Sequence, residues 1–252
     1  MKRDKETISL FNETGRRITD KEGYRRCLWC MEEYSEEYEL CPECGSPAEF
    51  EVENALHMYP GTVLNDKYVV GRVLGSGGFG VTYLATQIGL NRKVAIKEFF
   101  MKDLCNRDEV TSHVSVGSNG SIEMVDRFKA KFLKEARNIA RLNHPNIIRI
   151  LDVFEENGTA YYVMEYAEGG SLADKIKRCG ALPESEAVRY ILQIADALGY
   201  IHEQKMNHLD IKPANIMLNE KDDAILIDFG LSKQYDAETG SQTSTTPVGI
   251  SE

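Results

Sequence analysis

The chain has 252 residues, of which 42% are hydrophobic and 28% are charged, and its formal net charge is -10. This length and composition predict one large or two small globular domains that bury a core, and they argue against a disordered protein. The acidic balance argues against general binding to nucleic acid or to anionic membranes, because such binding needs Lys and Arg side chains that neutralise phosphates.

The start of the chain carries few signals. Residues 1–26 have mixed charge and no apolar periodicity, which predicts a mobile N-terminal arm or a short helix. They contain no apolar core of the kind found in signal peptides, and no run of about 18 apolar residues occurs in the chain. We therefore expect a cytoplasmic protein with no membrane segment.

Residues 27–60 contain two C-x-x-C pairs, Cys27 with Cys30 and Cys41 with Cys44, separated by ten residues. Each pair can place two thiolates on one tetrahedral metal ion, and Zn²⁺ takes four such ligands at a closed structural site. A unit of about 30 residues has too small a core to fold without such support. The segment resembles a zinc ribbon, in which the metal holds the fold and does not catalyse. Disulfides or free thiols are the alternative, and the lack of a signal peptide disfavours disulfides.

The charge of this segment indicates what it contacts. Residues 27–60 include nine Glu and no Lys or Arg, so they would repel a nucleic-acid backbone. A protein-facing or purely structural role is the better interpretation. The other two cysteines, Cys105 and Cys179, stand alone in the sequence, and we expect them to have no chemical role.

A strand pattern begins after a turn-rich connection at residues 57–65. Residues 68–74 and 81–88 are rich in β-branched and aromatic residues, and the glycine-rich stretch GSGGFG separates them at residues 75–80. A G-x-G-x-x-G pattern also marks dinucleotide-binding folds, but there the glycines open a helix. Here strand-like residues follow, which predicts a hairpin. Glycines at its tip would let backbone N–H groups approach phosphates, so the hairpin is expected to cover a nucleotide.

The next predicted strand, residues 93–99, carries a lysine that could serve the same nucleotide. Because side chains alternate along a strand, Ala95 and Lys97 share one face while Val94 and Ile96 share the other. A lysine beside an alanine on a cleft-facing surface suits an adenine and its phosphates. A solvated lysine with no ligand is the alternative.

Residues 100–125 are polar and turn-rich, which predicts a loop insertion. Apolar residues then recur at helical spacing up to residue 142. Glu135 adjoins their stripe, either as a rim residue or as an ion-pair partner of Lys97. The elements expected after this helix are strands at residues 147–154 and 160–167, a short helix ending at residue 180, and a longer helix at about 183–203. Small strands followed by helices predict two lobes.

The most informative stretch is residues 207–230. It contains the motifs H-x-D-x-K-x-x-N (His208, Asp210, Lys212 and Asn215) and D-F-G (Asp228, Phe229 and Gly230). Between them, two apolar runs flank a polar turn, which is the pattern of a hairpin. The two motifs would lie at its outer ends, so Asp210, Asn215 and Asp228 are predicted to converge on one spot.

These motifs, in this order, resemble those of the protein kinase family. Besides the glycine-rich hairpin and the two motifs above, the chain has VAIK at residues 94–97, HPNI at 144–147 and MEY at 164–166. The resemblance runs from about residue 68 to the end of the chain. The residues around the glycines and the EGGSL stretch look most like bacterial serine/threonine kinases, some of which carry an N-terminal zinc ribbon.

The resemblance implies an α+β fold, with a two-lobed protein-kinase-like domain at residues 61–252 preceded by the small zinc ribbon. A β-rich N-lobe would span about residues 66–167. A partial helical C-lobe would span about residues 168–252 and end in the activation segment. Because the chain stops before any A-P-E motif, we expect a fragment of a longer kinase.

The resemblance also implies roles for the site residues. Asp210 would orient the substrate hydroxyl, Lys212 would stabilise the γ-phosphate, and Asn215 and Asp228 would hold Mg²⁺. Lys97, fixed by Glu135, would hold the α- and β-phosphates. The remaining nucleotide contacts would come from the glycine-rich hairpin, the residues that sandwich adenine, and the edge and rear of its pocket: Gly75, Gly77 and Gly80; Leu74, Thr82, Ala95 and Met217; and Glu165, Ala167 and Met164.

Three residues depart from the family pattern. Leu209 stands where regulated kinases have an Arg that pairs with a phosphorylated activation loop, and a leucine cannot do so. Thr82 replaces the usual Val, and Ile250 stands where Ser/Thr kinases usually have a Thr that contacts the catalytic Asp. The Thr and Ser cluster at residues 239–246 is a candidate for autophosphorylation, with Thr246 nearest the family's usual site.

The resulting hypothesis is an ATP-dependent serine/threonine kinase, or the N-terminal part of one, that acts on a protein with a Ser or Thr acceptor. Its cofactors would be Mg²⁺ and a structural Zn²⁺. Lys212, in place of the Ala or Arg typical of tyrosine kinases, favours Ser or Thr as the acceptor. The alternative is a non-catalytic, pseudokinase-like nucleotide-binding or scaffold module, in which the ribbon contacts partner proteins.

Overall fold

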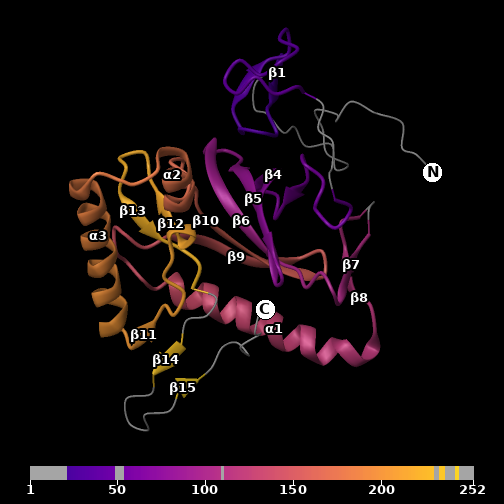
Figure 1. Cartoon of the computed structure of the whole chain (residues 1–252). Coiled ribbons are helices and arrows are strands. Elements are labelled where there is room, and N and C mark those ends of the chain that lie inside the picture. Colours follow the sequence, from indigo (N-terminus) through magenta and orange to yellow (C-terminus); the bar gives the residue numbers. More distant parts are fainter. Residues whose placement is uncertain (1–21, 49–53, 109–110, 230–232, 236–241, 244–252) are drawn as a thin grey trace. The chain divides into compact units, whose positions relative to one another are not determined.

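The computed structural model describes residues 22–48, 54–108, 111–229, 233–235 and 242–243. It separates the chain into two compact units, Met1–Ala130 with Asp152–Tyr166 and Lys131–Leu151 with Ala167–Glu252. Figure 1 labels the elements of both units. The predictions for most of the N-terminal arm, and those for Gly230, Thr246 and Ile250, lie outside the described residues.

The first unit is built around a six-stranded sheet with the strand order β3-β4-β5-β6-β10-β9. The five predicted strands are present, with the bounds β4 Tyr68–Gly77, β5 Gly80–Gln87, β6 Arg92–Phe99, β9 Ile150–Glu156 and β10 Thr159–Glu165. The sixth, β3 (Val63–Leu64), lies in the segment predicted to be a turn-rich connection. β-Branched and aromatic residues favour these strands because they pack well on a pleated surface. The core of the sheet consists of buried side chains such as Val70, Tyr83, Ala85, Val94, Ile96 and Val163.

Two short strands lie at the start of the described chain. β1 (Tyr24–Arg26) and β2 (Glu33–Ser35) pair antiparallel and flank the first C-x-x-C pair. The second pair follows in a loop that a bridge between Leu40 and Pro47 closes. The cysteine segment is therefore a β-hairpin with one C-x-x-C turn at its tip and a second turn after it.

The insertion after β6 is more ordered than the sequence predicts. It contains a second hairpin, β7 (Cys105–Arg107) paired with β8 (Val114–Val116), and the 3₁₀ helix η1 (Asn119–Ser121). The predicted helix α1 (Ile122–Ile139) follows. The prediction of a plain loop at residues 100–125 was therefore wrong over much of its length.

A buried ion pair explains this order. Arg107 of β7 lies 2.6 Å from the Glu98 carboxylate of β6, and both side chains are inaccessible to solvent. The hydroxyls of Tyr83 and Tyr161 donate to the same carboxylate at 2.9 and 3.0 Å. Burying a carboxylate is tolerated only when its oxygens are paired in this way, because an unpaired buried charge is strongly destabilising. Because the partners come from four separate segments, no local pattern reveals them.

Besides the end of α1, the described part of the second unit carries two α-helices. α2 (Leu172–Cys179) begins with a capping box, in which Ser171 Oγ accepts the Asp174 N–H, and it ends at Gly180, whose φ of 76° is left-handed. α3 (Glu184–Glu203) follows almost as predicted, and at helical spacing it buries Tyr190, Ile194, Ala197 and Ile201. None of the described helices combines the length and the hydropathy needed to cross a bilayer.

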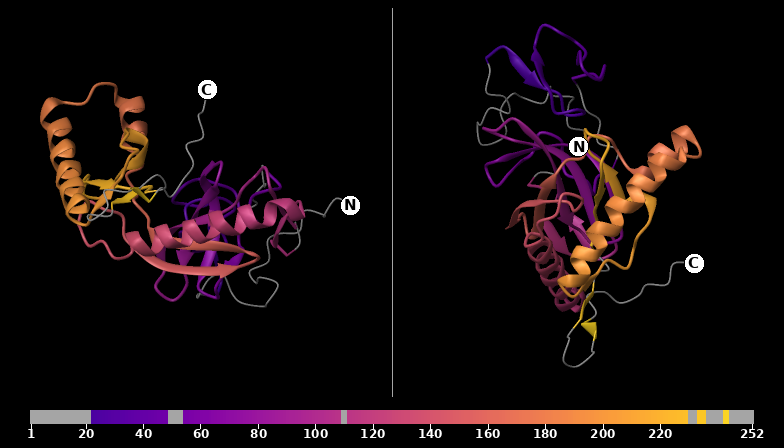
Figure 2. Two further views of the ribbon diagram at one scale, coloured as in Figure 1. Left: turned by 90° about the horizontal axis from the view of Figure 1, so that it is seen from below. Right: turned by 90° about the vertical axis from the view of Figure 1, so that its left-hand side faces the viewer.

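The strands of the second unit are short. They are β11 (Met206–Asn207), β12 (Ile216–Leu218), β13 (Ala224–Leu226), β14 (Lys233–Tyr235) and β15 (Gln242–Thr243), with the 3₁₀ helix η2 (Pro213–Asn215) before β12. β12 and β13 form the predicted hairpin, with Met217 opposite Ile225. Figure 2 shows this hairpin beside α2 and α3. The two polar motifs therefore flank the hairpin at its open end.

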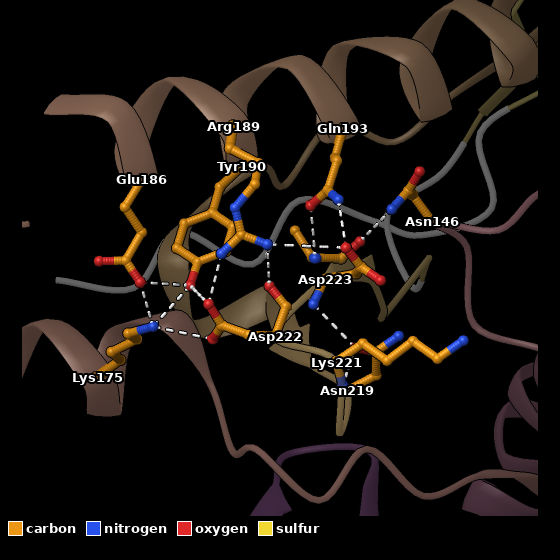
Figure 3. Close-up of polar contacts among 11 residues, drawn as sticks. Asn146, Lys175, Glu186, Arg189, Tyr190, Gln193, Asn219, Lys221, Asp222 and Asp223 are labelled. Carbon is orange, nitrogen blue, oxygen red and sulfur yellow. Dashed lines mark hydrogen bonds and ion pairs between the residues drawn. The ribbon is translucent and has the colours of Figure 1, made fainter. Parts of the chain in front are cut away.

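The turn between β12 and β13 is held to both helices by ion pairs and hydrogen bonds (Figure 3). Asp222 accepts hydrogen bonds from the Tyr190 hydroxyl at 2.7 Å and from Lys175 Nζ at 2.9 Å, and it pairs with Arg189. Lys175 also contacts Glu186 of α3. Partial burial of Asp222 opposes its ionisation, but the hydrogen bonds from Tyr190, Lys175 and Arg189 outweigh this effect and lower the Asp222 pKa to about 2.

A second set of hydrogen bonds fixes the start of β13. Gln193 of α3 donates from Nε2 to the Asp223 carboxylate at 2.7 Å and accepts the Ala224 N–H at 2.8 Å. The buried Asn146 side chain donates to the Ala224 carbonyl at 2.8 Å. Within the turn, Asn219 Oδ1 accepts the Asp223 N–H at 2.9 Å. The hairpin therefore has one defined position within the second unit.

A buried histidine fixes the open end of the hairpin. His208 is 1% exposed, and its ring lies edge-on to Phe229 with the centroids 4.8 Å apart. Its Nε2 lies 2.9 Å from the Ile227 carbonyl oxygen, which can only accept, so Nε2 carries the proton. Nδ1 then accepts the Asp210 N–H at 3.4 Å. Burial lowers the pKa of His208, which favours this neutral form.

Removing the charge of Asp222 tests the anchoring of the turn. We expect Asp222→Asn to lower the thermal midpoint at neutral pH by roughly 3–6 °C, because three donors lose their carboxylate. Glu220→Gln, which changes an exposed acid of the same turn, is the matched control and should shift the midpoint by about 1 °C or less. Because the folded-state pKa of Asp222 is about 2, below its ordinary 3.8, the advantage of wild type should shrink as the pH falls through that window. Equal midpoints at neutral pH would contradict the anchoring.

The neutral His208 makes stability depend on pH in a range above that of Asp222. Its folded-state pKa lies below the ordinary 6.5, so the unfolded chain binds the proton more readily and stability falls as the pH drops below 6.5. We expect His208→Gln to be less stable than wild type near neutrality and to lose less stability between about pH 7 and pH 5. Urea unfolding at several pH values measures both quantities. The exposed control His202→Gln should keep the wild-type pH dependence, and a wild-type dependence in His208→Gln would refute this assignment.

Candidate active site and metal centre

Four of the residues predicted to hold a nucleotide lie on one face of the first unit's sheet. In the strand register, Gly75 lies opposite Thr82, Thr82 opposite Lys97, and Ala95 opposite Met164. Residues directly opposite one another in a sheet point to the same face. One face of β5, β6 and β10 therefore carries Thr82, Ala95, Lys97 and Met164. This confirms the prediction, from the alternation along residues 93–99, that Ala95 and Lys97 share a face.

The glycine-rich stretch is the tip of a strand hairpin, as predicted. β4 and β5 pair up to Gly77 opposite Gly80. A Cβ at Gly80 would lie 2.4 Å from the Glu98 carbonyl oxygen, so only glycine fits there, whereas a Cβ at Gly75 or Gly77 would meet nothing within 4 Å. The open space beside Gly75 and Gly77 is what a backbone that approaches phosphates requires.

Two aromatic contacts of this unit escaped the sequence analysis. Phe79, at the hairpin tip, stacks on Phe128 of α1 with the ring centroids 5.4 Å apart. Lys97 is half-buried, and its Nζ lies 5.9 Å from the ring centroid of Tyr162, its partner in the β6–β10 register. Both contacts depend on strand register and helix placement. In the sequence, only the strand-like pattern of residues 160–167 points to Tyr162.

The other predicted nucleotide contacts lie near the ends of elements. They are the half-buried Leu74 in β4, the exposed Glu165 that ends β10, the buried Ala167 that opens a segment of the second unit, and the half-buried Met217 in β12. Glu135 is half-buried on the part of α1 that belongs to the second unit. Its pairing with Lys97 stays a prediction.

In the second unit, three residues of the H-x-D-x-K-x-x-N motif contact one another directly. Asn215 Nδ2 donates to the Asp210 backbone carbonyl at 2.9 Å and to Asp210 Oδ2 at 2.8 Å. Lys212 Nζ lies 2.8 Å from the same Oδ2, and this carboxylate raises the pKa of Lys212. Asn215 is buried while Lys212 is exposed. The loop therefore presents a carboxylate, an ammonium and an amide within a few ångströms of one another.

Backbone contacts link Asp228 to this group. The Ile227 N–H donates to the Asn215 carbonyl at 3.0 Å, and the Ile227 carbonyl accepts from His208. Asp228 follows directly, half-buried and with a left-handed φ of 60°. Within the described part of the chain, both hydrogen bonds of the Asn215 side chain come from Nδ2, so its oxygen Oδ1 is the atom that could serve a cation. An amide oxygen and a carboxylate are ligands that suit Mg²⁺.

Leu209 has an unusual conformation inside this motif. Its φ is 67°, which is rare for a residue with a branched apolar side chain, and its side chain is 52% exposed. An exposed leucine carries no charge with which to bind a phosphate. The position where the resemblance implies an arginine therefore offers only apolar surface.

The four cysteines of residues 27–44 converge, as their spacing predicts. Their sulfurs all lie within 4.8 Å of one another, with Cys27 3.5 Å from Cys44 and Cys30 3.7 Å from Cys41. A disulfide would bring two sulfurs to about 2.05 Å. Four thiolates at about 2.3 Å from a tetrahedral Zn²⁺ would lie about 3.8 Å apart. The donor set and its spacing therefore fit zinc.

Comparisons with known proteins bear on the residues after the cysteine segment. A family model described as protein kinase domain matches residues 68–250. A probable serine/threonine-protein kinase of Clostridium perfringens is 36% identical over 73% of this chain and 24% of its own length. The serine/threonine-protein kinases PknB of Mycobacterium leprae and PrkC of Bacillus subtilis are each 34% identical, over 73% and 75% of this chain. They are covered over 27% and 26% of their lengths, so the chain spans about a quarter of these relatives.

A solved structure described as "PpkA-294 apo form" has a TM-score of 0.65 and 28% identity to this chain, and the match covers 69% of this chain and 62% of that one. The predicted protein-kinase-like fold is thus confirmed. The family match includes the glycine-rich hairpin, Lys97 and the loop that carries Asp210, Asn215 and Asp228. With most of its length covered by the family model and by these relatives, the chain belongs to the protein kinase family.

Proposed function

We propose that this chain carries the nucleotide-binding and phosphoryl-transfer groups of an ATP-dependent protein serine/threonine kinase. The observation that carries this proposal is the contact group of Asp210, Lys212 and Asn215, because it combines an oriented carboxylate with a cation and a metal-binding oxygen. Membership of the protein kinase family, and relatives named serine/threonine-protein kinases, support the same activity.

Asp210 is the group proposed to receive the substrate hydroxyl. Its two side-chain contacts among the described residues, from Asn215 and Lys212, both fall on Oδ2. Oδ1 is therefore the oxygen that can accept a hydrogen bond from a Ser or Thr hydroxyl and orient it for attack. Holding the nucleophile in the reactive geometry is a large part of what a kinase contributes to phosphoryl transfer.

Charge neutralisation is the other part. Lys212 contacts Asp210, which is proposed to receive the substrate hydroxyl, and would stabilise the transferred γ-phosphoryl group. Lys97, with Glu135 as its partner, would hold the α- and β-phosphates. Asn215 and Asp228 would hold Mg²⁺, which supplies compensation for the negative charge of the phosphates when it is bound. The glycine-rich hairpin would cover the phosphates with backbone N–H groups.

Adenine recognition is assigned to the apolar residues near these groups. Leu74, Thr82, Ala95 and Met217 would sandwich the base, with Met164 at the rear of its pocket. Backbone groups from Glu165 to Ala167 would bind its edge. Thr82 is close in shape to the usual Val, so this change should alter the packing of adenine only slightly.

The acceptor and the control of the enzyme follow from two residues of the same loop. Lys212 favours a Ser or Thr acceptor on a protein substrate. Leu209 cannot pair with a phosphorylated activation loop, so we propose that activity does not require phosphorylation of Thr246. A cluster of four thiols needs a reducing environment to remain unpaired, and we infer a cytoplasmic location.

The four clustered cysteines are proposed to hold one structural Zn²⁺. Four thiolates leave no open position for a water molecule, so the ion would stabilise the ribbon and not take part in phosphoryl transfer. The acidic ribbon would serve protein contacts, either with the rest of this chain or with a partner. A scaffold module without catalysis is the competing function.

Labelling with Mg·ATP tests the proposed activity. Wild type should transfer the γ-phosphate to itself or to a generic basic protein, and Asp228→Asn should lower the rate by about a hundredfold or more, because a metal ligand is weakened. Glu220→Gln is the matched control, since it also neutralises one acid but lies in the turn at the far end of the hairpin; it should label like wild type. Equal labelling by wild type and Asp228→Asn would refute the catalytic role and leave the scaffold function.

Elemental analysis tests the metal site. The purified chain should contain about one zinc ion, and Cys41→Ser should lose it together with protection of residues 27–48 from proteolysis. Cys179→Ser removes an exposed cysteine outside the cluster and should retain the zinc. A wild-type chain that is folded at residues 27–48 and free of zinc would rule out the site.

A further inference from the structure

The two C-x-x-C turns differ at the position that follows each pair: it is Met31 after Cys27–Cys30 and Gly45 after Cys41–Cys44. In the turn that starts at Cys27, the Met31 N–H donates to the Cys27 carbonyl at 2.8 Å, and Met31 has a φ of 66°. In the turn that starts at Cys41, the Gly45 N–H makes the equivalent bond at 2.7 Å, and Gly45 has a φ of 72°. The left-handed region suits glycine and disfavours residues with a Cβ. Met31 therefore bears a backbone strain that Gly45 avoids, which calls for a function of its side chain.

The Met31 side chain fills a space above a glycine of the kinase sheet. Met31 is 2% exposed. A Cβ added to Gly71 of β4 would lie 2.6 Å from Met31 Cε and 2.6 Å from the Leu28 carbonyl oxygen. The Met31 side chain thus packs into the space that the missing side chain of Gly71 leaves above β4. Neither residue could be exchanged for the other's type without a change at this contact.

Hydrogen bonds hold the two segments together on both sides of this contact. The Arg72 N–H donates to the Leu28 carbonyl, and Arg72 Nε donates to the Trp29 carbonyl, both at 2.9 Å. The next residue of β4 after the glycine therefore binds the same cysteine turn through its backbone and its side chain. Because these donors and acceptors are backbone and guanidinium groups, they define the orientation of the turn on the strand.

A second connection joins the ribbon to the turn between β5 and β6. The buried Arg26 donates to the Met31 carbonyl at 2.8 Å and to Asn91 Oδ1 at 2.9 Å. Lys93 at the start of β6 pairs with Glu32 at 2.7 Å. The ribbon is thus attached to two separate places of the sheet, so it cannot rotate about a single contact.

The ribbon shares its apolar contact with residues predicted to surround adenine. Leu28 and Met31 form one buried cluster with Val69 and Leu84, and Leu74 and Tyr166 pack against that cluster. Leu84 lies directly opposite Ala95 in the β5–β6 register. Leu74 and Ala95 are proposed to contact adenine, and Tyr166 lies within the segment proposed to bind its edge. The ribbon therefore covers the continuation of the sheet face that carries the proposed adenine contacts.

We propose that the first cysteine turn is a positioning element for the nucleotide, with Met31 and Leu28 as positioning residues that act through β4. By filling the space above Gly71 they would hold β4, and with it Leu74, in the arrangement that binds adenine. The ribbon would then couple metal binding to nucleotide binding, because the turn that carries Met31 is also the turn that carries Cys27 and Cys30. This inference rests on the proposed nucleotide-binding function.

The test separates docking of the ribbon from its folding. Met31→Gly removes the docking side chain but suits a φ of 66°, so the ribbon should keep about one zinc ion per chain. Gly71→Ala disturbs the same contact from the β4 side. Leu40→Ala changes an exposed apolar residue of the ribbon outside this contact and serves as the matched control. All variants are made in the full 252-residue chain.

Three quantities are measured for each variant: zinc content, hydrogen exchange of the Arg72 amide, and the Kd of Mg·ADP by calorimetry. We expect Met31→Gly and Gly71→Ala to keep zinc, to exchange the Arg72 amide faster, and to raise the Kd about fivefold or more. The double variant should bind nearly as the single variants do, since both act on one contact. Leu40→Ala should match wild type in all three measurements.

The outcomes distinguish this inference from the proposed function. Faster Arg72 exchange with an unchanged Kd would show that docking of the ribbon on the sheet does not affect nucleotide binding. This result would overturn the inference but not the proposed function. Unchanged Arg72 exchange in Met31→Gly would overturn the docking contact itself. A wild-type chain that binds no Mg·ADP would overturn the proposed function, and the coupling with it. Loss of zinc from Met31→Gly would show that Met31 serves the ribbon fold, which also contradicts the inference.

Discussion

The pair of hydrogen bonds from Asn215 to Asp210 is the contact on which the candidate active site depends. Asn215 Nδ2 donates to both the backbone carbonyl and the carboxylate of Asp210, and so closes the loop on itself. Among the described residues, Asn215 and Lys212 both contact the same oxygen of this carboxylate, and the other oxygen is the one proposed to receive a substrate hydroxyl. The same bonds leave the amide oxygen of Asn215 for the proposed Mg²⁺. In the proposed function this one side chain would serve both positioning and metal binding, two contributions on which phosphoryl transfer depends.

This loop is held in place by the hairpin that follows it. At the open end, the neutral His208 joins the loop to Ile227, one residue before Asp228. At the closed end, Asp222 gathers charged and hydroxyl donors from α2 and α3. The two ends use different chemistry for a physical reason. A buried imidazole is stable in its neutral form when both nitrogens have partners, whereas a partly exposed carboxylate keeps its charge because cations surround it.

Two sets of contacts stabilise the first unit: a buried ion pair inside the sheet, and the packing of the cysteine segment on one face of the sheet. Glu98 is buried with Arg107 and two tyrosine hydroxyls, and leaving any of these groups unpaired would be costly. The ribbon contributes a methionine in a strained conformation to a glycine of β4. A segment too small to fold by its own core thereby becomes part of the apolar cluster that includes Leu74. The cysteine segment and the kinase sheet therefore share one buried cluster, and this contact is the basis of the proposed link between metal binding and nucleotide binding.

The sequence by itself determined the family, five strands of the large sheet, the three α-helices, the β12–β13 hairpin and the convergence of the four cysteines, because these features depend on short motifs and on local periodicity. It did not reveal the β7–β8 hairpin, whose Arg107 pairs with Glu98 from another strand, nor Tyr162 beside Lys97, which depends on register. It identified the cysteine pairs but not the contact of Met31 with Gly71, because neither a backbone angle nor the space above Gly71 can be read from residue types. The tertiary structure decided these points, since each is a contact between segments that no local window of sequence contains.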